Sequence, residues 1–125
     1  TPSWTWHEHG HEGEGPTIWL DVLDMPAVIS LGPIFLERYR TEQFPEKAPP
    51  GLTRHVYGAG LLPVDREPAA SSPLFHYPYE RSRAAVAALG ASRALDPVHG
   101  ARLEYVNPAT GGSVTPTIST FLQWY

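Results

Sequence analysis

Three histidines alternate with other residues near the start of the chain: His7, His9 and His11. Neutral imidazoles bind transition metals, and an imidazole that titrates near neutral pH can also accept or donate a proton. On a β-strand, side chains two positions apart share a face and lie roughly 6.6 to 6.8 Å apart along it. The spacing therefore predicts that His7 and His9 point to one side of a strand while Trp4 and Trp6 pack on the other, as in the wall of a small barrel that holds a metal.

The same spacing leaves a second interpretation open, in which these imidazoles bind nothing. A His-x-His pair often lies on an exposed strand or loop, so the short pattern does not by itself establish a metal site. The acidic side chains nearby are expected to form a solvated loop tip rather than to act as ligands; they are Glu8, Glu12 and Glu14. The remaining histidines stand singly and are expected at the surface or in packing; they are His55, His76 and His99.

Two strands joined by a loop are expected to carry the histidine segment. Residues 4–7 and 16–23 are rich in Trp and β-branched side chains, and glycines and glutamates separate them. Asp21 lies in the second of these strands. On residue type alone, a carboxylate there indicates a position on an edge strand.

The segment that follows is expected to begin with a short helix and then to run as an extended connector. The helix is predicted within residues 27–39, with Asp24 as its N-cap and Pro26 in its first turn. The pair Gly32-Pro33 must end or kink it. Residues 40–78 hold many prolines, each of which removes a backbone donor and fixes φ, so long regular elements are not expected there.

The last third of the chain is predicted to hold one helix and further strands. Residues 79–94 are dense in Ala and Arg and favour a helix, with Gly90 near a break or end. A strand over 102–106, a turn at 108–112 and extended structure over 114–125 are expected to follow.

Composition and charge exclude several classes of protein. The 125 residues are 42% hydrophobic and 18% charged, which is typical of a folded domain. A net charge of −4 without a cluster of Lys or Arg argues against nucleic acid as a partner. The longest mostly apolar stretch, 27–36, is too short and too interrupted to span a membrane. Cysteine is absent, which permits a cytoplasmic location, and the missing initial Met leads us to expect a fragment.

Longer strings of residues resemble the gentisate 1,2-dioxygenase family of bicupin ring-cleaving dioxygenases, which includes the salicylate and 1-hydroxy-2-naphthoate 1,2-dioxygenases. The first is Trp-Thr-Trp-His-Glu-His-Gly at 4–10, followed by Pro-Thr-Ile-Trp-Leu-Asp-Val-Leu-Asp-Met-Pro at 16–26. The second is Asn-Pro-Ala-Thr-Gly-Gly at 107–112, with Pro-Thr-Ile at 116–118 and Gln-Trp at 123–124. The resemblance covers both ends of the chain, whereas the middle shares only its Pro-rich character.

A shorter pattern resembles the second conserved motif of cupin barrels. It is Pro2-x-Trp4-x-x-His7-x-x-x-His11, in which the first His stands where the motif has its last metal ligand. Trp4 replaces the usual Gly of that motif, and His11 replaces the usual Asn. The substitution at position 11 gives slight support to a second hypothesis, a bicupin without catalysis that serves as a small-molecule binding or structural module.

The family resemblance implies a mainly β fold made of parts of two cupin barrels, each a double-stranded β-helix or jelly roll. A Pro-rich linker with a short helix would join them. Residues 1–31 would be the C-terminal strands of the first barrel, 32–99 the linker with its helix near 79–94, and 100–125 the first strands of the second barrel.

The resemblance also implies an Fe(II)-dependent, gentisate 1,2-dioxygenase-like enzyme of extradiol type. Such an enzyme would use O2 to open a hydroxylated aromatic carboxylate, of the gentisate or salicylate type, between the carboxyl-bearing and hydroxyl-bearing carbons. By resemblance we expect a homo-oligomer, specifically a tetramer, in the cytoplasm, with a small aromatic carboxylate and O2 as its partners. With only one of three iron ligands present, the isolated piece is expected to be inactive.

The resemblance assigns roles to three side chains. His7 matches the last of the three iron-binding histidines of the first barrel. His9 matches a residue that acts on the bound substrate and its phenolic proton. Asp21 matches a family position from which a carboxylate can bond to His9 and fix its orientation.

Overall fold

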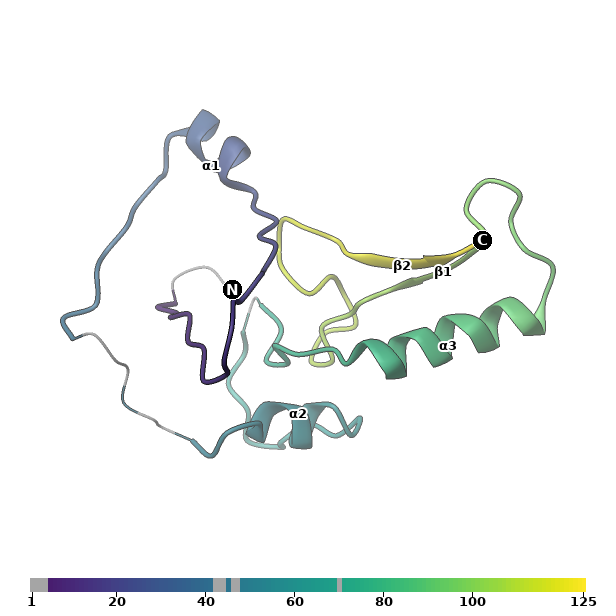
Figure 1. Cartoon of the computed structure of the whole chain (residues 1–125), viewed down its shortest axis with the longest axis horizontal. Coiled ribbons are helices and arrows are strands. Elements are labelled where there is room, and N and C mark those ends of the chain that lie inside the picture. The colour runs from purple at the N-terminus through teal and green to yellow at the C-terminus, as the bar shows by residue number, and fades with distance from the viewer. Residues whose placement is uncertain (1–4, 42–44, 46–47, 70) are drawn as a thin grey trace. The chain divides into compact units, whose positions relative to one another are not determined.

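A computed structural model describes residues 5–41, 45, 48–69 and 71–125 (Figure 1). Trp4, on which part of the barrel-wall prediction rests, lies outside these residues. The chain divides into two compact units, which meet in the sequence between residues 47 and 48. Each unit is described by itself below.

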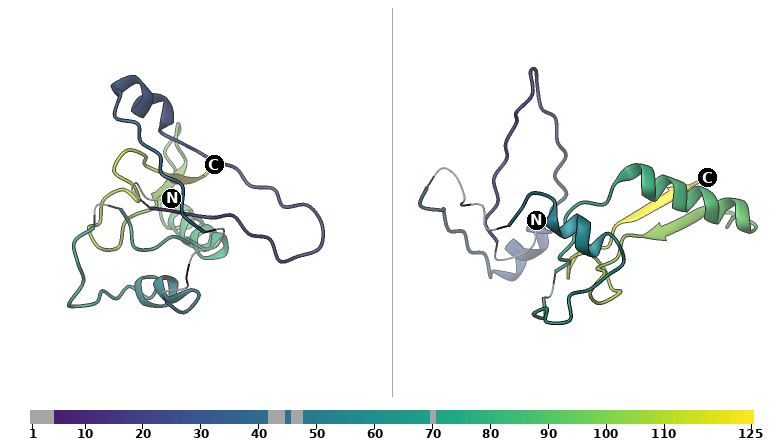
Figure 2. Two further views of the ribbon diagram at one scale, coloured as in Figure 1. Left: turned by 90° about the vertical axis from the view of Figure 1, so that its left-hand side faces the viewer. Right: turned by 90° about the horizontal axis from the view of Figure 1, so that it is seen from below.

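The first unit begins with a long two-armed loop that leads into helix α1 (Figure 2). Among the described residues 5–24, neither arm forms a regular strand. The prediction of two strands, over 4–7 and 16–23, is therefore wrong for the described residues of those ranges. A lone pair of extended arms is marginally stable in water, because a sheet needs further strands or a helix to cover its apolar face. Ile18 and Leu20 are correspondingly 92% and 88% exposed.

Helix α1 spans Met25–Leu31, and its ends lie where the sequence places them. Asp24 stands at the N-cap, and its carbonyl oxygen accepts the backbone N–H groups of the first helical turn. Pro26 is in the first turn, where a missing N–H costs little. Gly32 ends the helix with φ of 85°, a left-handed conformation that glycine adopts without steric cost. The predicted region 27–39 is therefore helical only in its first part.

The second unit opens with helix α2, Leu52–Tyr57, inside the region predicted to be an extended connector. That prediction is wrong for these six residues. The prolines at 49 and 50 precede the helix, and Gly51 introduces it with φ of 75°. Because proline is disfavoured inside a helix rather than before it, the Pro-free run of residues 52–57 can form one.

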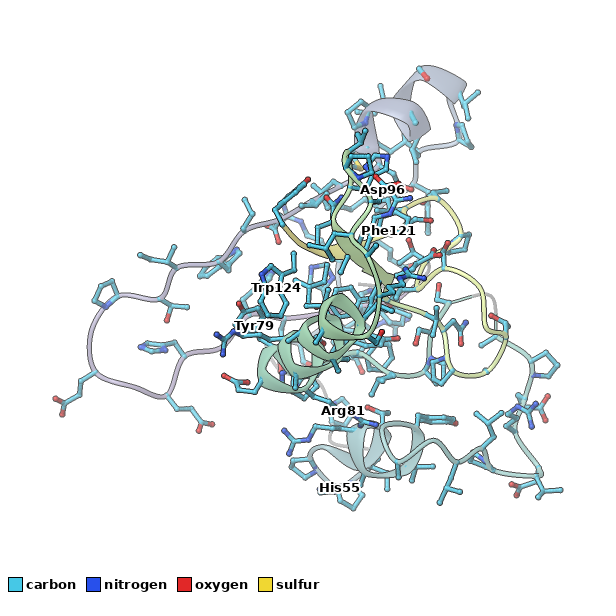
Figure 3. The ribbon with its side chains drawn as sticks, turned by 90° about the vertical axis from the view of Figure 1, so that its right-hand side faces the viewer. His55, Tyr79, Arg81, Asp96, Phe121 and Trp124 are labelled. Carbon is cyan, nitrogen blue, oxygen red and sulfur yellow. The ribbon has the colours of Figure 1, made fainter. Side chains whose placement is uncertain are left out.

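Helix α3, Tyr79–Ser92, confirms the helix predicted over 79–94 and packs against a two-stranded antiparallel sheet. Strands β1, Ala101–Glu104, and β2, Phe121–Trp124, pair with Ala101 opposite Trp124. Gly90 lies near the end of α3, as predicted, and there it faces Ala101 and Trp124. Figure 3 shows Trp124 on the side of the sheet next to α3.

The buried core of the second unit is small. Val86 of α3 and Ala101 of β1 are 3% and 1% exposed, and Leu74 joins them from the preceding segment. In the part of the chain that is described, this sheet and three helices are the regular elements, so the two-barrel arrangement stays a prediction. No helix within these residues is long and apolar enough to cross a membrane.

The predicted turn at 108–112 is confirmed, and it is organised by the residue just before it. Asn107 is fully buried; its Oδ1 accepts the N–H of Ala109 at 2.9 Å, and its carbonyl oxygen accepts the N–H of Gly111 at 2.8 Å. Gly111 has φ of 75°, which a β-carbon would disfavour. An isolated bridge between Val106 and Ser113 closes the base of the turn.

Candidate active site

The rings of His7 and His9 lie next to each other on the first arm of the loop. Their centroids are 5.3 Å apart and their planes meet at 88°, an edge-to-face contact. Both side chains are exposed. The two imidazoles therefore share one side of the backbone, as their spacing predicts, although this segment is not a regular strand.

Trp19, on the second arm, meets His9 across the loop. The imidazole and indole rings stack with their centroids 5.1 Å apart and their planes within 9° of parallel. Trp19 was not predicted as a site residue. The signal for it was present, because an aromatic residue stands two positions before Asp21 on the arm expected to face the histidines.

Asp21 lies two residues beyond Trp19 and is exposed. The ring contacts found for His9 are those with His7 and Trp19. The bond between Asp21 and His9 that the resemblance implies therefore stays a prediction. Both residues belong to one loop whose arms meet at the stacked rings.

Trp6 is held by a different segment of the first unit. Its Nε1 donates a hydrogen bond to the carbonyl oxygen of Glu37 at 3.2 Å, and its ring meets that of Tyr39 edge-on with 5.1 Å between centroids. The prediction that Trp6 has a packing role is confirmed, although half of its surface is exposed.

His11, the third histidine of the cluster, lies close to Gly13 at the loop tip. A β-carbon built on Gly13 would come within 3.0 Å of Cε1 of the His11 ring, so this imidazole lies over the backbone of its own turn. In residues 5–41, 45, 48–69 and 71–125 there is no group of three or more His, Cys, Asp or Glu side chains that could hold a metal ion. The exposed imidazole of His7 suits Fe(II) in its chemistry, but it could supply only one ligand of a larger set.

No protein-family model matches the chain. Individual curated proteins do match it. Gentisate 1,2 dioxygenase 1 from Aquipseudomonas alcaligenes is 43% identical over 124 residues, which cover 98% of this chain and 36% of that protein. The 5-aminosalicylate 1,2-dioxygenase from Comamonas sp is 33% identical over 121 residues, 95% of this chain and 32% of the relative.

A third relative, 1-hydroxy-2-naphthoate 1,2-dioxygenase from Nocardioides sp. (strain KP7), is 30% identical over 126 residues, 99% of this chain and 31% of its own length. The chain thus spans about a third of the length of the curated relatives it matches. The similarity extends through the middle of the chain, beyond the two ends where the sequence motifs were recognised. Over nearly its whole length, this chain is similar to one part of the gentisate 1,2-dioxygenases and their related 1,2-dioxygenases.

Proposed function

We propose that this chain is the central part of an Fe(II)-dependent, ring-cleaving bicupin dioxygenase. The enzyme would open a hydroxylated aromatic carboxylate of the gentisate or salicylate type with O2, between the carboxyl-bearing and hydroxyl-bearing carbons. The observation that carries this proposal is the 43% identity over 124 residues to gentisate 1,2 dioxygenase 1 of Aquipseudomonas alcaligenes. The adjacent rings of His7 and His9 support it, because they offer a metal donor and a proton-transfer group side by side.

In this proposal His7 is one of three histidine ligands of the iron. Its ring is exposed on the loop, so it can meet a metal that is held jointly with ligands from outside the described residues. When bound, Fe(II) supplies open coordination positions for a chelating substrate and for O2. The edge contact with the His9 ring restricts the orientation of His7, and metal ligands depend on such outer contacts.

His9 is proposed to act on the substrate rather than on the metal. The parallel stack on Trp19 restricts the plane of the His9 ring, and the 5.3 Å between the His7 and His9 centroids would bring a substrate held at His7 close to that ring. There it would take the phenolic proton. Asp21 is proposed to bond to the second nitrogen of His9 in the assembled site and so fix its orientation.

The term extradiol does not fit this reaction. An extradiol cleavage breaks a ring bond beside two adjacent hydroxyl groups. Here the proposed bond joins a carbon that bears a carboxyl group to one that bears a hydroxyl group, which agrees with the 1,2 position in the relatives' names. We therefore propose a 1,2-dioxygenase without the extradiol label.

In this proposal the chain consists of three parts. Residues 1–31 would belong to strands of the first barrel, 32–99 to a linker and 100–125 to strands of the second barrel. Helix α3 falls in the linker part, yet it packs against β1 and β2 of the last part. Linker and second-barrel residues would therefore form one folded body. A tetrameric assembly and a cytoplasmic location are proposed on resemblance alone.

The test uses the full-length enzyme that would contain this chain. His7→Ala should lose stoichiometric iron together with activity, because one of three imidazole ligands is gone. His9→Ala should keep its iron and lose turnover, measured as O2 consumption and as ring-opened product with gentisate and with salicylate. His55→Ala, on α2, is the matched control and should change neither. Full iron occupancy in the His7 variant would overturn the ligand assignment.

A non-catalytic bicupin that binds a small molecule or has a structural role is the second candidate. It is favoured by His11, which stands where the cupin motif has an Asn. The same full-length protein separates the two candidates. A catalytic enzyme should contain iron and consume O2 with an aromatic substrate, whereas the non-catalytic module should do neither.

A further inference from the structure

The second unit contains a cavity of about 410 Å³, which the proposed dioxygenase site does not use. It lies where the first two turns of α3 face the sheet and the end of α2, and every lining residue belongs to the segment 54–122. Cavities that hold small molecules and cofactors have volumes of about 300 to 1,000 Å³. The cavity is therefore large enough for a ligand of one or two rings.

The floor of the cavity is apolar and contains an ordered pair of aromatic rings. Leu103 and Leu122, opposite each other on β1 and β2, line it together with Tyr77 and Tyr105. The two tyrosine rings meet edge-on, with 5.4 Å between centroids and 75° between planes. Such a surface matches the flat apolar face of an aromatic ring.

The ring of Tyr77 is fixed at its far end by hydrogen bonds. Its hydroxyl donates to the carbonyl oxygen of Val106 at 2.8 Å and lies 2.9 Å from Oγ of Ser72. Ser72 is itself held by the preceding segment, because its Oγ also contacts the carbonyl oxygen of Leu74 at 3.1 Å. The aromatic floor is thus preformed, and binding would not have to order it.

The rim of the cavity is cationic, in contrast to the chain as a whole. Arg54 and Arg81 line it against a single acidic residue, Glu104, although the whole chain carries a net charge of −4. Oε1 of Glu104 accepts a hydrogen bond from Oγ of Ser113 at 3.0 Å, which occupies part of that carboxylate. The rim therefore favours an anion over a cation.

Arg81 is held in position by its own backbone contact. One guanidinium nitrogen donates to the carbonyl oxygen of Gly58, just after α2, and Figure 3 shows the side chain between α3 and α2. A guanidinium has five N–H donors, so this contact leaves others for a ligand. Arginine binds carboxylates through paired N–H donors with defined geometry.

We propose that this cavity binds a small aromatic carboxylate, with its ring on Tyr77 and Tyr105 and its carboxylate at Arg54 and Arg81. The proposal does not depend on the dioxygenase function, because it needs neither iron nor His7. Binding here would be a second recognition event, distinct from the proposed catalysis at the histidine loop.

The experiment titrates the iron-free chain with 2-naphthoate and, in parallel, with the neutral 2-naphthamide, and follows binding by calorimetry. The carboxylate should bind with a Kd below about 1 mM, and the amide should bind at least about tenfold more weakly, since it lacks the charge-assisted bonds. His7→Ala should bind 2-naphthoate as the unaltered chain does. No binding of 2-naphthoate, or equal binding of the amide, would overturn the proposal.

Two pairs of variants on α3 locate the ligand. Ala85→Trp fills the cavity from a lining position, whereas Ala84→Trp adds the same side chain at a neighbouring exposed position that does not line it. Arg81→Gln keeps a donor for Gly58 but removes the charge, and Arg83→Gln is its control. Loss of at least about tenfold in affinity is expected for Ala85→Trp and Arg81→Gln only. Equal effects within each pair, with helix content verified by circular dichroism, would contradict the assignment.

Discussion

The imidazole of His9 lies parallel to the indole of Trp19, with 5.1 Å between the ring centroids and 9° between their planes. This stack joins the two arms of the loop at one point in a segment without a strand ladder. It also restricts the plane in which the imidazole of His9 lies. Trp19 is therefore a positioning residue in the proposed site, acting through His9 and not on the substrate.

Trp19→Leu should lower kcat in the full-length enzyme by about two- to tenfold, which corresponds to the loss of an aromatic pair worth about 0.5–1.5 kcal/mol. Iron content should not change, because the stack involves His9 and not His7. Steady-state kinetics and iron analysis provide the two measurements. KM should change less than kcat.

Trp19→Phe is the conservative partner of that variant, since it keeps an aromatic ring against the imidazole. It should recover most of the lost kcat. Unchanged activity in Trp19→Leu, or a loss that Trp19→Phe does not recover, would show that the stack does not orient His9.

Local sequence signals were sufficient for the helix ends and the turn. Asp24, Pro26 and Gly32 act within one or two residues of themselves, and α1 begins and ends beside them. The Ala-rich run of α3 forms a helix through Gly90, because glycine weakens a helix by only about 1 kcal/mol and packing on Ala101 and Trp124 accompanies it.

Features that depend on distant partners could not be predicted in the same way. Alternation placed His7 and His9 on one side, but the stack with Trp19 requires the two arms to meet, which no local pattern specifies. The run at 16–23 has strand composition, yet a strand forms only when a neighbour supplies hydrogen bonds and cover. The many prolines of residues 40–78 argue against long regular elements, but they do not exclude a short helix in the Pro-free run 52–57, so the sequence does not predict α2.

Val86→Ala should destabilise the second unit by about 1–3 kcal/mol, because it leaves a cavity in a core with few other buried side chains. Denaturant unfolding followed by circular dichroism measures the free energy of unfolding. Val64→Ala makes the same chemical change at a side chain that is 98% exposed, and it should have almost no effect. Equal losses in the two variants would mean that α3 does not form its core contact with the sheet.

The loop between α3 and β1 should be sensitive to acid through Asp96. Its Oδ1 accepts the N–H groups of His99 at 2.7 Å and Val98 at 2.8 Å, and these bonds lower the pKa of the carboxyl below its usual 3.8. A depressed folded-state pKa means that the stabilisation is complete above pH 3.8 and is lost as pH falls through the lowered value.

The amide resonances of Val98 and His99 should therefore share one transition on acidification below pH 3.8, where Asp96 gains its proton. In Asp96→Asn this common shift should be absent, because the amide oxygen still accepts hydrogen bonds but does not titrate. A common transition that persists in Asp96→Asn would assign the acid response to another group.

Gly100 directly precedes β1, at a position where no β-carbon fits. Its φ is 62°, and a β-carbon there would collide with the carbonyl oxygen of Trp124 on the paired strand. Gly60 has a similar φ of 78° but no atom within 4 Å of the corresponding position. Comparing alanine at the two positions therefore separates the cost of left-handed backbone from the cost of the collision.

Gly60→Ala should lower the free energy of unfolding by about 1–2 kcal/mol. Gly100→Ala should lower it by roughly a further 1–3 kcal/mol, because the backbone of Trp124 must move away and weaken the β1–β2 pairing. If denaturant unfolding gives the same loss for both variants, the close approach of Gly100 to β2 does not exist in solution.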